Sequence, residues 1–338
     1  LECSVATCLI GLGANQGDRA ANLAAAVELL SNSPEISVDR ESQAYPSQAA
    51  VGGGRQDDFL NAALTLQTTL APAQLLSALQ GIETQLGRRR GDRWAARAID
   101  LDLLIYDDLV LNEPDLVLPH PRMAYRRFVL EPAVEIAPDF VHPATECTVK
   151  HLMSRLDELP RRIAITGASC QQNKRLARQA AEKSNADLVE ESPIAELPNQ
   201  LAELLASPTC QTAIELTNHQ RTVPLAGLDP ASPLAPNATE ISSSWFGESY
   251  ALAKLLLPSI ELKEFEHWWE AMQYADELQR TTLIVVLLAP GDGEWSARLQ
   301  VEIKQLATRP RRSPWLVLNA CESDWALTEV VAAIEAMQ

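Results

Sequence analysis

Long apolar runs are absent from this 338-residue sequence. The longest, Leu283–Ala289, has the length of a buried strand and falls far short of the roughly 20 residues that a membrane-spanning helix requires. The start of the sequence also lacks the charged-then-apolar pattern of a secretory leader. We therefore expect a soluble, cytoplasmic protein that has no membrane partner.

Clustered cysteines are also lacking. The chain has six cysteines, and no two of them form a C-x-x-C pair: Cys3, Cys8, Cys147, Cys170, Cys210 and Cys321. A structural zinc site needs ligands that lie close together, so this spacing argues against one. We expect free, buried thiols in a reducing compartment.

Positive charge is scarce, with 28 Lys and Arg against 45 Asp and Glu and a net charge of −17. An acidic surface repels nucleic acid, so we expect no nucleic-acid partner. One segment differs, because five arginines fall within residues 88–97: Arg88, Arg89, Arg90, Arg93 and Arg97. A basic cluster in an acidic protein indicates a small polyanion such as a nucleoside triphosphate. On charge alone, a solvated loop is the alternative.

Length and composition predict two globular domains. Hydrophobic residues make up 46% of the chain and charged residues 22%, which is typical of folded proteins. A chain of this length exceeds a single ordinary core. A boundary near Pro160, before a fresh basic-then-apolar segment, predicts domains at 1–159 and 160–338.

The first half alternates strand-like and helix-like patterns. These patterns predict strands at 5–12, 59–67 and 98–106, an extended segment at 36–45, and helices at 18–30, 72–87, 128–136 and 148–157. The order strand, helix, strand, strand, helix, strand is typical of the split βαβ, ferredoxin-like pattern. We therefore predict an α+β, ferredoxin-like N-terminal domain.

The second half predicts an α/β domain with a parallel sheet. The expected elements are strands at 161–167, 187–190, 282–289 and 315–319 and helices at 174–184 and 324–336. The stretch 222–240 is rich in Pro, Ala and Thr, and we expect it to be a long loop.

Asp100 and Asp102 form the central candidate pair for chemistry. In a strand, residues i and i+2 point to the same face, so Leu101 and Leu103 would point into the core and hold the two carboxylates outward. Two carboxylates without His or Cys suit a hard cation such as Mg²⁺, which takes its other ligands from water and nucleotide phosphates. The alternative is an exposed strand face with two solvated acids. The arginine-rich segment just before this strand favours phosphoryl transfer, which needs cations beside the metal.

Four segments together resemble the signature blocks of one enzyme family. They are IGLGANQGDRAANL (10–23), DFLNAALTL (58–66), GRRRGDRWAARAIDLDLLIY (87–106) and LPHPRMAYRRFVLEPAVEIAP (118–138). In order and spacing they are similar to 6-hydroxymethyl-7,8-dihydropterin pyrophosphokinases, over roughly residues 4–158. That resemblance implies a transferase that moves a diphosphate from ATP to the hydroxymethyl group of a reduced pterin and releases AMP, in folate biosynthesis.

The resemblance also implies roles for individual residues. It assigns catalysis to Arg88, Arg97, Asp100 and Asp102, and two Mg²⁺ ions to the carboxylates of Asp100 and Asp102. It assigns pterin binding to Ser47, Phe59, Asn61, Trp94 and Phe128. It assigns ATP binding to Gln80, Glu83, Arg88, Arg90, Trp94, Arg97, Leu103, His120 and Arg126. Taken singly, Phe59 and Phe128 could be core aromatics and His120 a core histidine. A non-catalytic binding protein is the competing interpretation of the whole set.

The second half begins like a strand, P-loop and helix at 163–182, but the pattern is degenerate. A working P-loop reads G-x-x-x-x-G-K-[ST], whereas here Gln172 stands at its second Gly and Lys174 comes one place late. Later segments resemble deoxynucleoside kinases weakly: LVEESP (188–193), SSSWFGESYALAK (242–254) and TTLIVVLLAP (281–290). We expect a degenerate, P-loop-kinase-like domain that is non-catalytic and serves structure, homodimerisation or partner binding. A bifunctional enzyme is the alternative.

Overall fold

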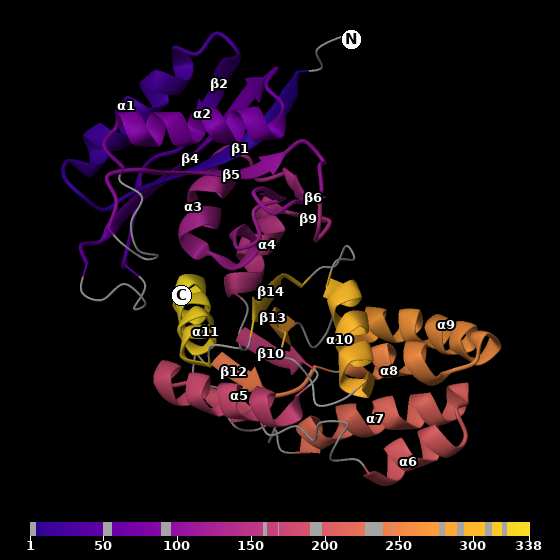
Figure 1. The fold of residues 1–338 in the computed structure, drawn as a ribbon. Coiled ribbons are helices and arrows are strands. Elements are labelled where there is room, and N and C mark those ends of the chain that lie inside the picture. Colours follow the sequence, from indigo (N-terminus) through magenta and orange to yellow (C-terminus); the bar gives the residue numbers. More distant parts are fainter. Residues whose placement is uncertain are drawn as a thin grey trace. The chain divides into compact units, whose positions relative to one another are not determined.

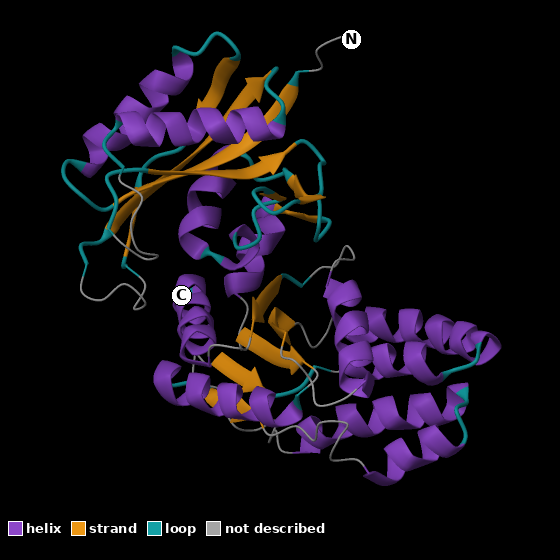
Figure 2. Cartoon of the chain, viewed as in Figure 1, coloured by secondary structure: helices purple, strands orange, loops and turns teal. Residues whose placement is uncertain are grey.

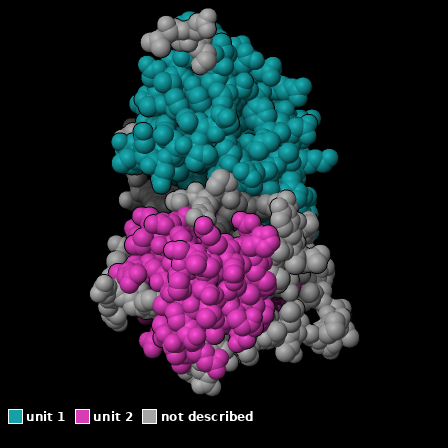
Figure 3. Space-filling model, turned by 90° about the vertical axis from the view of Figure 1, so that its right-hand side faces the viewer, with its two compact units in different colours: residues 1–157, 310–312, 332–338 teal, residues 158–309, 313–331 magenta. Residues whose placement is uncertain are grey.

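The chain folds into two compact units, which Figure 3 shows in different colours. One unit comprises residues 1–157, 310–312 and 332–338, and the other residues 158–309 and 313–331. The computed structural model describes residues 5–49, 56–88, 96–157, 161–167, 169–189, 198–226, 239–245, 247–276, 281–288, 294–307, 313–319 and 323–338. Each unit is described by itself below.

The N-terminal unit is built on a five-stranded antiparallel sheet. Its strands are β1 (Ala6–Ala14), β2 (Ile36–Glu41), β3 (Tyr45–Ser47), β4 (Phe59–Thr68) and β5 (Asp100–Tyr106). The order is β2-β4-β1-β5, and β3 also pairs with β4. Strand β5 therefore lies at an edge of the sheet. The predicted order of strands and helices is confirmed, although β5 begins two residues later than expected.

Helices cover both faces of this sheet (Figure 1). The unit's α-helices are α1 (Arg19–Ser31), α2 (Pro72–Gln85), α3 (Arg127–Ile136) and α4 (Val149–Asp157). Helices α1 and α2 lie on one face and α3 lies on the other. The Asp18 carboxylate begins α1 by accepting a hydrogen bond from the Ala21 amide, as expected for an N-cap. All four helices agree with the sequence prediction.

The remaining elements of this unit are short. They are β6 (Leu111–Asn112), β7 (Val117–Leu118), β8 (Val141–His142), β9 (Cys147–Thr148) and the 3₁₀ helix η2 (Met123–Tyr125). Strands β6 and β7 pair with each other, as do β8 and β9. Only Pro119 separates the end of β7 from His120.

Strand register brings the two halves of the candidate site together. In β1, Gly13 lies opposite Asn61 of β4 on one side and opposite Asp100 of β5 on the other. Directly opposite residues of an antiparallel pair project to the same face. Asn61 and Asp100 therefore share one face of the sheet, two strands apart, with only a glycine between them. On the other face, Leu101 and Leu103 are buried in the core against α1 and α2, as predicted.

The second unit has a five-stranded sheet in which every pair is parallel (Figure 2). Its strands are β10 (Arg161–Gly167), β11 (Asp187–Val189), β12 (Thr239–Ser242), β13 (Thr281–Leu288) and β14 (Trp315–Asn319), in the order β11-β12-β10-β13-β14. Its helices are α5 (Cys170–Ser184), α6 (Pro198–Ala206), α7 (Cys210–Ala226), α8 (Glu248–Leu256), α9 (Ser259–Asp276), α10 (Glu294–Ala307) and α11 (Ser323–Met337). The predicted parallel α/β architecture is confirmed.

Two boundaries in this unit were predicted wrongly. Helix α5 begins at Cys170 and not at Lys174, because Ser169 caps it by accepting a hydrogen bond from the Gln172 amide. The stretch 222–240 is not one long loop, since α7 continues to Ala226 and β12 begins at Thr239. The part at 227–238 lies outside the described residues. Composition predicted a loop over the whole stretch, whereas its first five residues, 222–226, are helical and its last two, 239–240, begin a strand.

Strand and helix join tightly at the carboxyl end of β10. Between Gly167 and the first residue of α5 there are only two residues. The Asn173 side chain is 2% exposed and donates a hydrogen bond to the Gly167 carbonyl at 3.2 Å. A Cβ at Gly167 would lie 2.5 Å from the Leu287 carbonyl oxygen of the neighbouring strand. Only glycine fits this close approach of backbones.

Among the described residues, no helix combines the length and apolarity that crossing a membrane would require.

Two glycine substitutions should change stability in opposite directions. Gly167→Ala places a methyl group against a backbone carbonyl, and we expect it to lower the free energy of unfolding by about 1–3 kcal/mol. The matched control Gly81→Ala lies inside α2 with open space around the new Cβ, and we expect it to raise that free energy by about 0.5–1 kcal/mol. Denaturant unfolding of both variants measures the difference. Equal effects would contradict the packing described at Gly167.

Candidate active site

Two carboxylates of β5 form the acidic centre of the candidate site. Asp100 and Asp102 alternate along the strand with buried Leu101 and Leu103 and so share the face that α1 and α2 leave uncovered. The Asp100 side chain is 23% exposed. No described residue donates a hydrogen bond to the Asp102 carboxylate, so its oxygens are available to a ligand. This arrangement agrees with the strand geometry that the sequence predicts.

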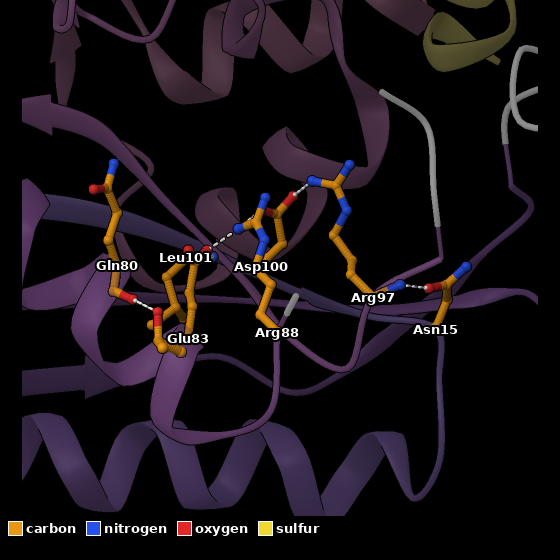
Figure 4. Close-up of polar contacts among 8 residues, drawn as sticks. Asn15, Gln80, Glu83, Arg88, Arg97, Asp100 and Leu101 are labelled. Carbon is orange, nitrogen blue, oxygen red and sulfur yellow. Dashed lines mark hydrogen bonds and ion pairs between the residues drawn. The ribbon is translucent and has the colours of Figure 1, made fainter. Parts of the chain in front are cut away.

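Two arginines hold the Asp100 carboxylate from both sides (Figure 4). The Arg88 guanidinium donates to Asp100 Oδ1 at 2.5 Å, and the Arg97 guanidinium donates to Asp100 Oδ2 at 2.7 Å. Each arginine side chain is 26% exposed. Both cations therefore stand at the surface beside the carboxylates, which is where a polyphosphate would need them.

Glu83 anchors this cluster to the edge of the sheet. The residue is buried and its carboxylate accepts the Leu101 amide of β5 at 2.7 Å. The same carboxylate forms an ion pair with Arg88. Burial raises the pKa of Glu83, while the Leu101 amide and Arg88 oppose that rise. Glu83, predicted as an ATP contact, is thus engaged with the protein, and its contact with ATP stays a prediction.

The electrostatics of Asp100 suit a divalent cation. Burial is the main cause that raises the pKa of Asp100, and the Asp102 carboxylate raises it further, against the effect of Arg97 and Arg88. Two like charges at this spacing repel each other, and a bound cation would relieve that repulsion. Among the described residues no group of three His, Cys, Asp or Glu gathers as a metal site. A metal held by Asp100 and Asp102 would therefore need further ligands from a phosphate or from water, which suits Mg²⁺.

His120 lies beside these charges as a neutral imidazole. Its amide donates to the Leu104 carbonyl of β5 at 2.8 Å, and its Nδ1 accepts the Arg122 amide at 3.2 Å. Because Nδ1 is an acceptor, the proton of the neutral ring is on Nε2. Burial lowers the pKa of His120 to about 3, and the Arg126 and Arg122 guanidiniums lower it too. Nε2 is therefore a hydrogen-bond donor at neutral pH.

The predicted pterin residues gather around Asn61. The Asn61 amide nitrogen donates to the Tyr45 carbonyl at 3.2 Å and to Ser47 Oγ at 2.8 Å. Since a carbonyl can only accept, these bonds fix which way the amide points. A Cβ at Gly13 would lie 3.5 Å from Asn61 Oδ1 and 3.9 Å from a ring carbon of Phe59. Gly13 thus keeps the space between Asn61 and Phe59 free of a side chain.

The two predicted stacking aromatics come from strand β4 and from helix α3, which packs on the same face of the sheet. Phe59 begins β4, and Phe128 lies in the first turn of α3, the helix on this face of the sheet. Both are half-buried. The Arg126 guanidinium lies 5.5 Å from the centroid of the Phe128 ring. Burial lowers the pKa of Arg126, and both Asp102 and Asp100 act against this. Arg126 therefore lies between the aromatic and the acidic parts of the candidate site.

The other predicted residues fall into two groups. Leu103 is 4% exposed in the core, so its side chain is turned away from the carboxylates, and Gln80 is exposed on α2. Their contacts with ATP stay predictions. Arg90 and Trp94 lie outside the described residues, as do Arg89 and Arg93 of the arginine cluster.

No role was predicted for Asn15 beyond its place in the segment 10–23. The residue is 2% exposed, and its Oδ1 accepts the Arg97 amide at 2.7 Å (Figure 4). A buried polar side chain next to a glycine-rich strand end was the available signal. Its partner lies 82 positions along the chain, however, beyond the reach of any local pattern.

Comparison with known proteins places this geometry in a family. The family model of 7,8-dihydro-6-hydroxymethylpterin-pyrophosphokinase matches residues 9–138. A 2-amino-4-hydroxy-6-hydroxymethyldihydropteridine pyrophosphokinase of Methylorubrum extorquens is 45% identical over 148 residues, which is 44% of this chain and 92% of that protein. The chain belongs to this family. A pyrophosphokinase of the same name from Synechocystis is 42% identical over 149 residues, 44% of this chain and 75% of that protein.

The family match ends before the second unit begins. A solved structure of deoxyadenosine kinase from M. mycoides with bound dATP covers 51% of this chain and 97% of that chain, at 13% identity and a TM-score of 0.35. A TM-score this low does not establish a common fold. The pyrophosphokinase family therefore accounts for the N-terminal unit alone.

The His120 imidazole should stay neutral well below its ordinary pKa of 6.5. We expect an NMR titration midpoint near pH 3 for its ring protons, assigned with a His120→Gln variant. Between pH 6.5 and 3 the unfolded chain would bind the proton that the folded chain excludes. The contribution of His120 to stability is therefore complete above pH 6.5 and is lost as the pH falls through this window. A midpoint near 6.5 would contradict the buried, neutral ring.

Proposed function

We propose that residues 1–159 transfer a diphosphate group from ATP to 6-hydroxymethyl-7,8-dihydropterin and release AMP, a step of folate biosynthesis. One observation carries the proposal. The Asp100 carboxylate, beside Asp102 on one strand face, is bridged by Arg88 and Arg97 within a chain that belongs to the pyrophosphokinase family. Carboxylates and arginines at one surface match the needs of phosphoryl transfer.

In this reaction the pterin hydroxyl oxygen bonds to the β-phosphorus of ATP and gives up its proton to water. The bond from that phosphorus to the α-phosphate oxygen breaks, and its electron pair leaves with AMP. Negative charge grows on the leaving AMP and on the transferring group. Arg88 and Arg97 would exchange their contacts with Asp100 for phosphate oxygens and so stabilise that charge. His120 Nε2–H and Arg126 would hold the nucleotide as neutral and charged donors. Little covalent protein chemistry is needed, because positioning and electrostatics supply most of the effect.

We propose Asp100 and Asp102 as the ligands of two Mg²⁺ ions. The Asp100 and Asp102 carboxylates would hold the ions, and Mg²⁺ when bound would supply neutralisation of the phosphate charge. The fit rests on the chemistry of these two residues: both are carboxylates on one strand face, and burial, with the neighbouring Asp102 carboxylate, raises the pKa of Asp100. The protein itself contributes the rigid strand, because Leu101 and Leu103 are anchored in the core.

For the pterin we propose a slot with Asn61 at its base. Phe59 and Phe128 would stack on the two ring faces, as flat heteroaromatic rings prefer. Asn61 Oδ1 would accept from the N–H groups of the ring, since its amide nitrogen is used by Tyr45 and Ser47. Trp94 and Arg90 keep the roles that the resemblance assigns them, as part of the same proposal.

For residues 160–338 we propose a non-catalytic role. Successive amides of a P-loop cradle phosphate, which needs a longer loop than the two residues between β10 and α5. Where that loop would begin, the Asn173 side chain donates a hydrogen bond to the Gly167 carbonyl, and the Leu287 carbonyl oxygen approaches the Gly167 Cα closely. The same proposal includes homodimerisation through this domain, a domain boundary at 159/160 and a cytoplasmic location. It also takes the N-terminal domain as ferredoxin-like and the second domain as kinase-like.

Activity is tested by AMP formation from ATP, Mg²⁺ and 6-hydroxymethyl-7,8-dihydropterin. We expect pterin-dependent AMP from the wild type and a loss of about 100-fold or more in Asp102→Ala, because a metal ligand is removed. The control Asp108→Ala makes the same chemical change at an exposed position after β5 and should keep full activity. If well-folded wild-type protein forms no AMP, the chain is a non-catalytic binding protein.

Nucleotide binding should locate to the N-terminal unit alone. We expect calorimetry with a non-hydrolysable ATP analogue and Mg²⁺ to give one site per chain. Arg97→Ala should weaken that site about tenfold or more, since a charge-assisted contact is lost. Lys174→Ala, a like change on α5, should leave the affinity unaltered. A second site that Lys174→Ala removes would show that the second unit binds nucleotide.

A further inference from the structure

Asn15 connects two segments that handle different substrates. It follows β1 directly, and its amide and side chain both engage Arg97: the Asn15 amide donates to the Arg97 carbonyl at 3.1 Å and Oδ1 accepts the Arg97 amide at 2.7 Å. The side-chain nitrogen points to the segment before β4. It donates to Gln56 Oε1 at 3.0 Å and more weakly to the Asp57 carbonyl at 3.4 Å.

Two more side chains of the same turn reach the same two segments. Arg19 donates to the Asp58 carbonyl at 2.6 Å, directly before Phe59. Asn22 donates to the Ala98 carbonyl at 3.0 Å, directly after Arg97. Residues 15–22, from the end of β1 through the first turn of α1, therefore hold the main chain at the entry to β4 and at the entry to β5. We name residues 15–22 the β1–α1 strap.

We propose that the β1–α1 strap is a positioning element that fixes Arg97 relative to Phe59, with Asn15 as its central positioning residue. The proposal rests on the proposed function, in which Arg97 faces the transferring phosphate and Phe59 faces the pterin. Transfer requires both substrates in one geometry, and small displacements lower the rate steeply. Asn15 is suited to this role because one amide supplies an acceptor to one segment and donors to the other.

The two arms of Asn15 can be separated by substitution. Asn15→Asp keeps an oxygen to accept the Arg97 amide but cannot donate to the Asp57 carbonyl. Asn15→Ala removes both arms. Asn32→Ala is the matched control, because it makes the same change at an exposed position at the far end of α1. All three are made in the full chain.

The experiment measures kcat and KM for ATP and for the pterin, with amide hydrogen exchange at Arg97 as a readout independent of activity. Asn15→Ala should lower kcat by about 10- to 100-fold and lose protection of the Arg97 amide. Asn15→Asp should keep that protection and most of kcat but raise KM for the pterin severalfold. Asn32→Ala should match the wild type in every measure.

Three outcomes would overturn the proposal. Asn15→Ala could retain wild-type kcat and KM, or Asn15→Asp could lose kcat as fully as Asn15→Ala does. If Asn15→Ala fails to fold, Asn15→Asp with an unchanged pterin KM would be decisive against it. An inactive wild type would instead refute the proposed function, and with it the role of the strap, so the two failures are distinguishable.

Discussion

The candidate site of the N-terminal unit depends on how the edge strand β5 holds Asp100 and Asp102 on one face. Arg88 and Arg97 bind the Asp100 carboxylate, and Leu101 and Leu103 anchor the strand in the core. The Glu83 carboxylate accepts a hydrogen bond from the Leu101 amide and so ties β5 to α2. In the proposed function, these carboxylates and arginines would together receive a cation and a polyphosphate.

The sequence predicted those parts of the fold and site that follow from local patterns. Alternation placed Asp100 and Asp102 outward and their leucines inward, and sequence patterns located the four α-helices α1 to α4 but not the short helix η2. Asn15 was missed because its role depends on a partner 82 residues away, which no local pattern encodes. Glu83 was predicted to face ATP, yet its buried carboxylate holds the strand edge, a contact visible only once α2 lies beside β5.

Errors in the second unit have a similar origin. The loop expected at 222–240 reflected composition, which does not show that α7 continues to Ala226 or that β12 begins at Thr239. The degenerate character of the P-loop-like start at 163–182 stays a prediction, and the sequence alone did not reveal how early α5 begins. Ser169 caps α5, and the Asn173 side chain donates a hydrogen bond to the Gly167 carbonyl. Both contacts lie at the carboxyl end of β10. The tight junction is therefore a structural feature of the domain.

Asn61, Gly13 and Asp100 lie opposite one another on three neighbouring strands, so the spacing of the strands sets the distance between Asn61 and Asp100. Neighbouring strands lie roughly 5 Å apart, so Asn61 and Asp100, the residues proposed to anchor the two substrates, are about 10 Å apart whatever the surrounding loops do. Because hydrogen-bonded strands hardly stretch, this separation is insensitive to insertions in the loops. A relative could exchange, lengthen or shorten its loops, and so change substrate affinity and product release, while the distance between these two positions stayed constant.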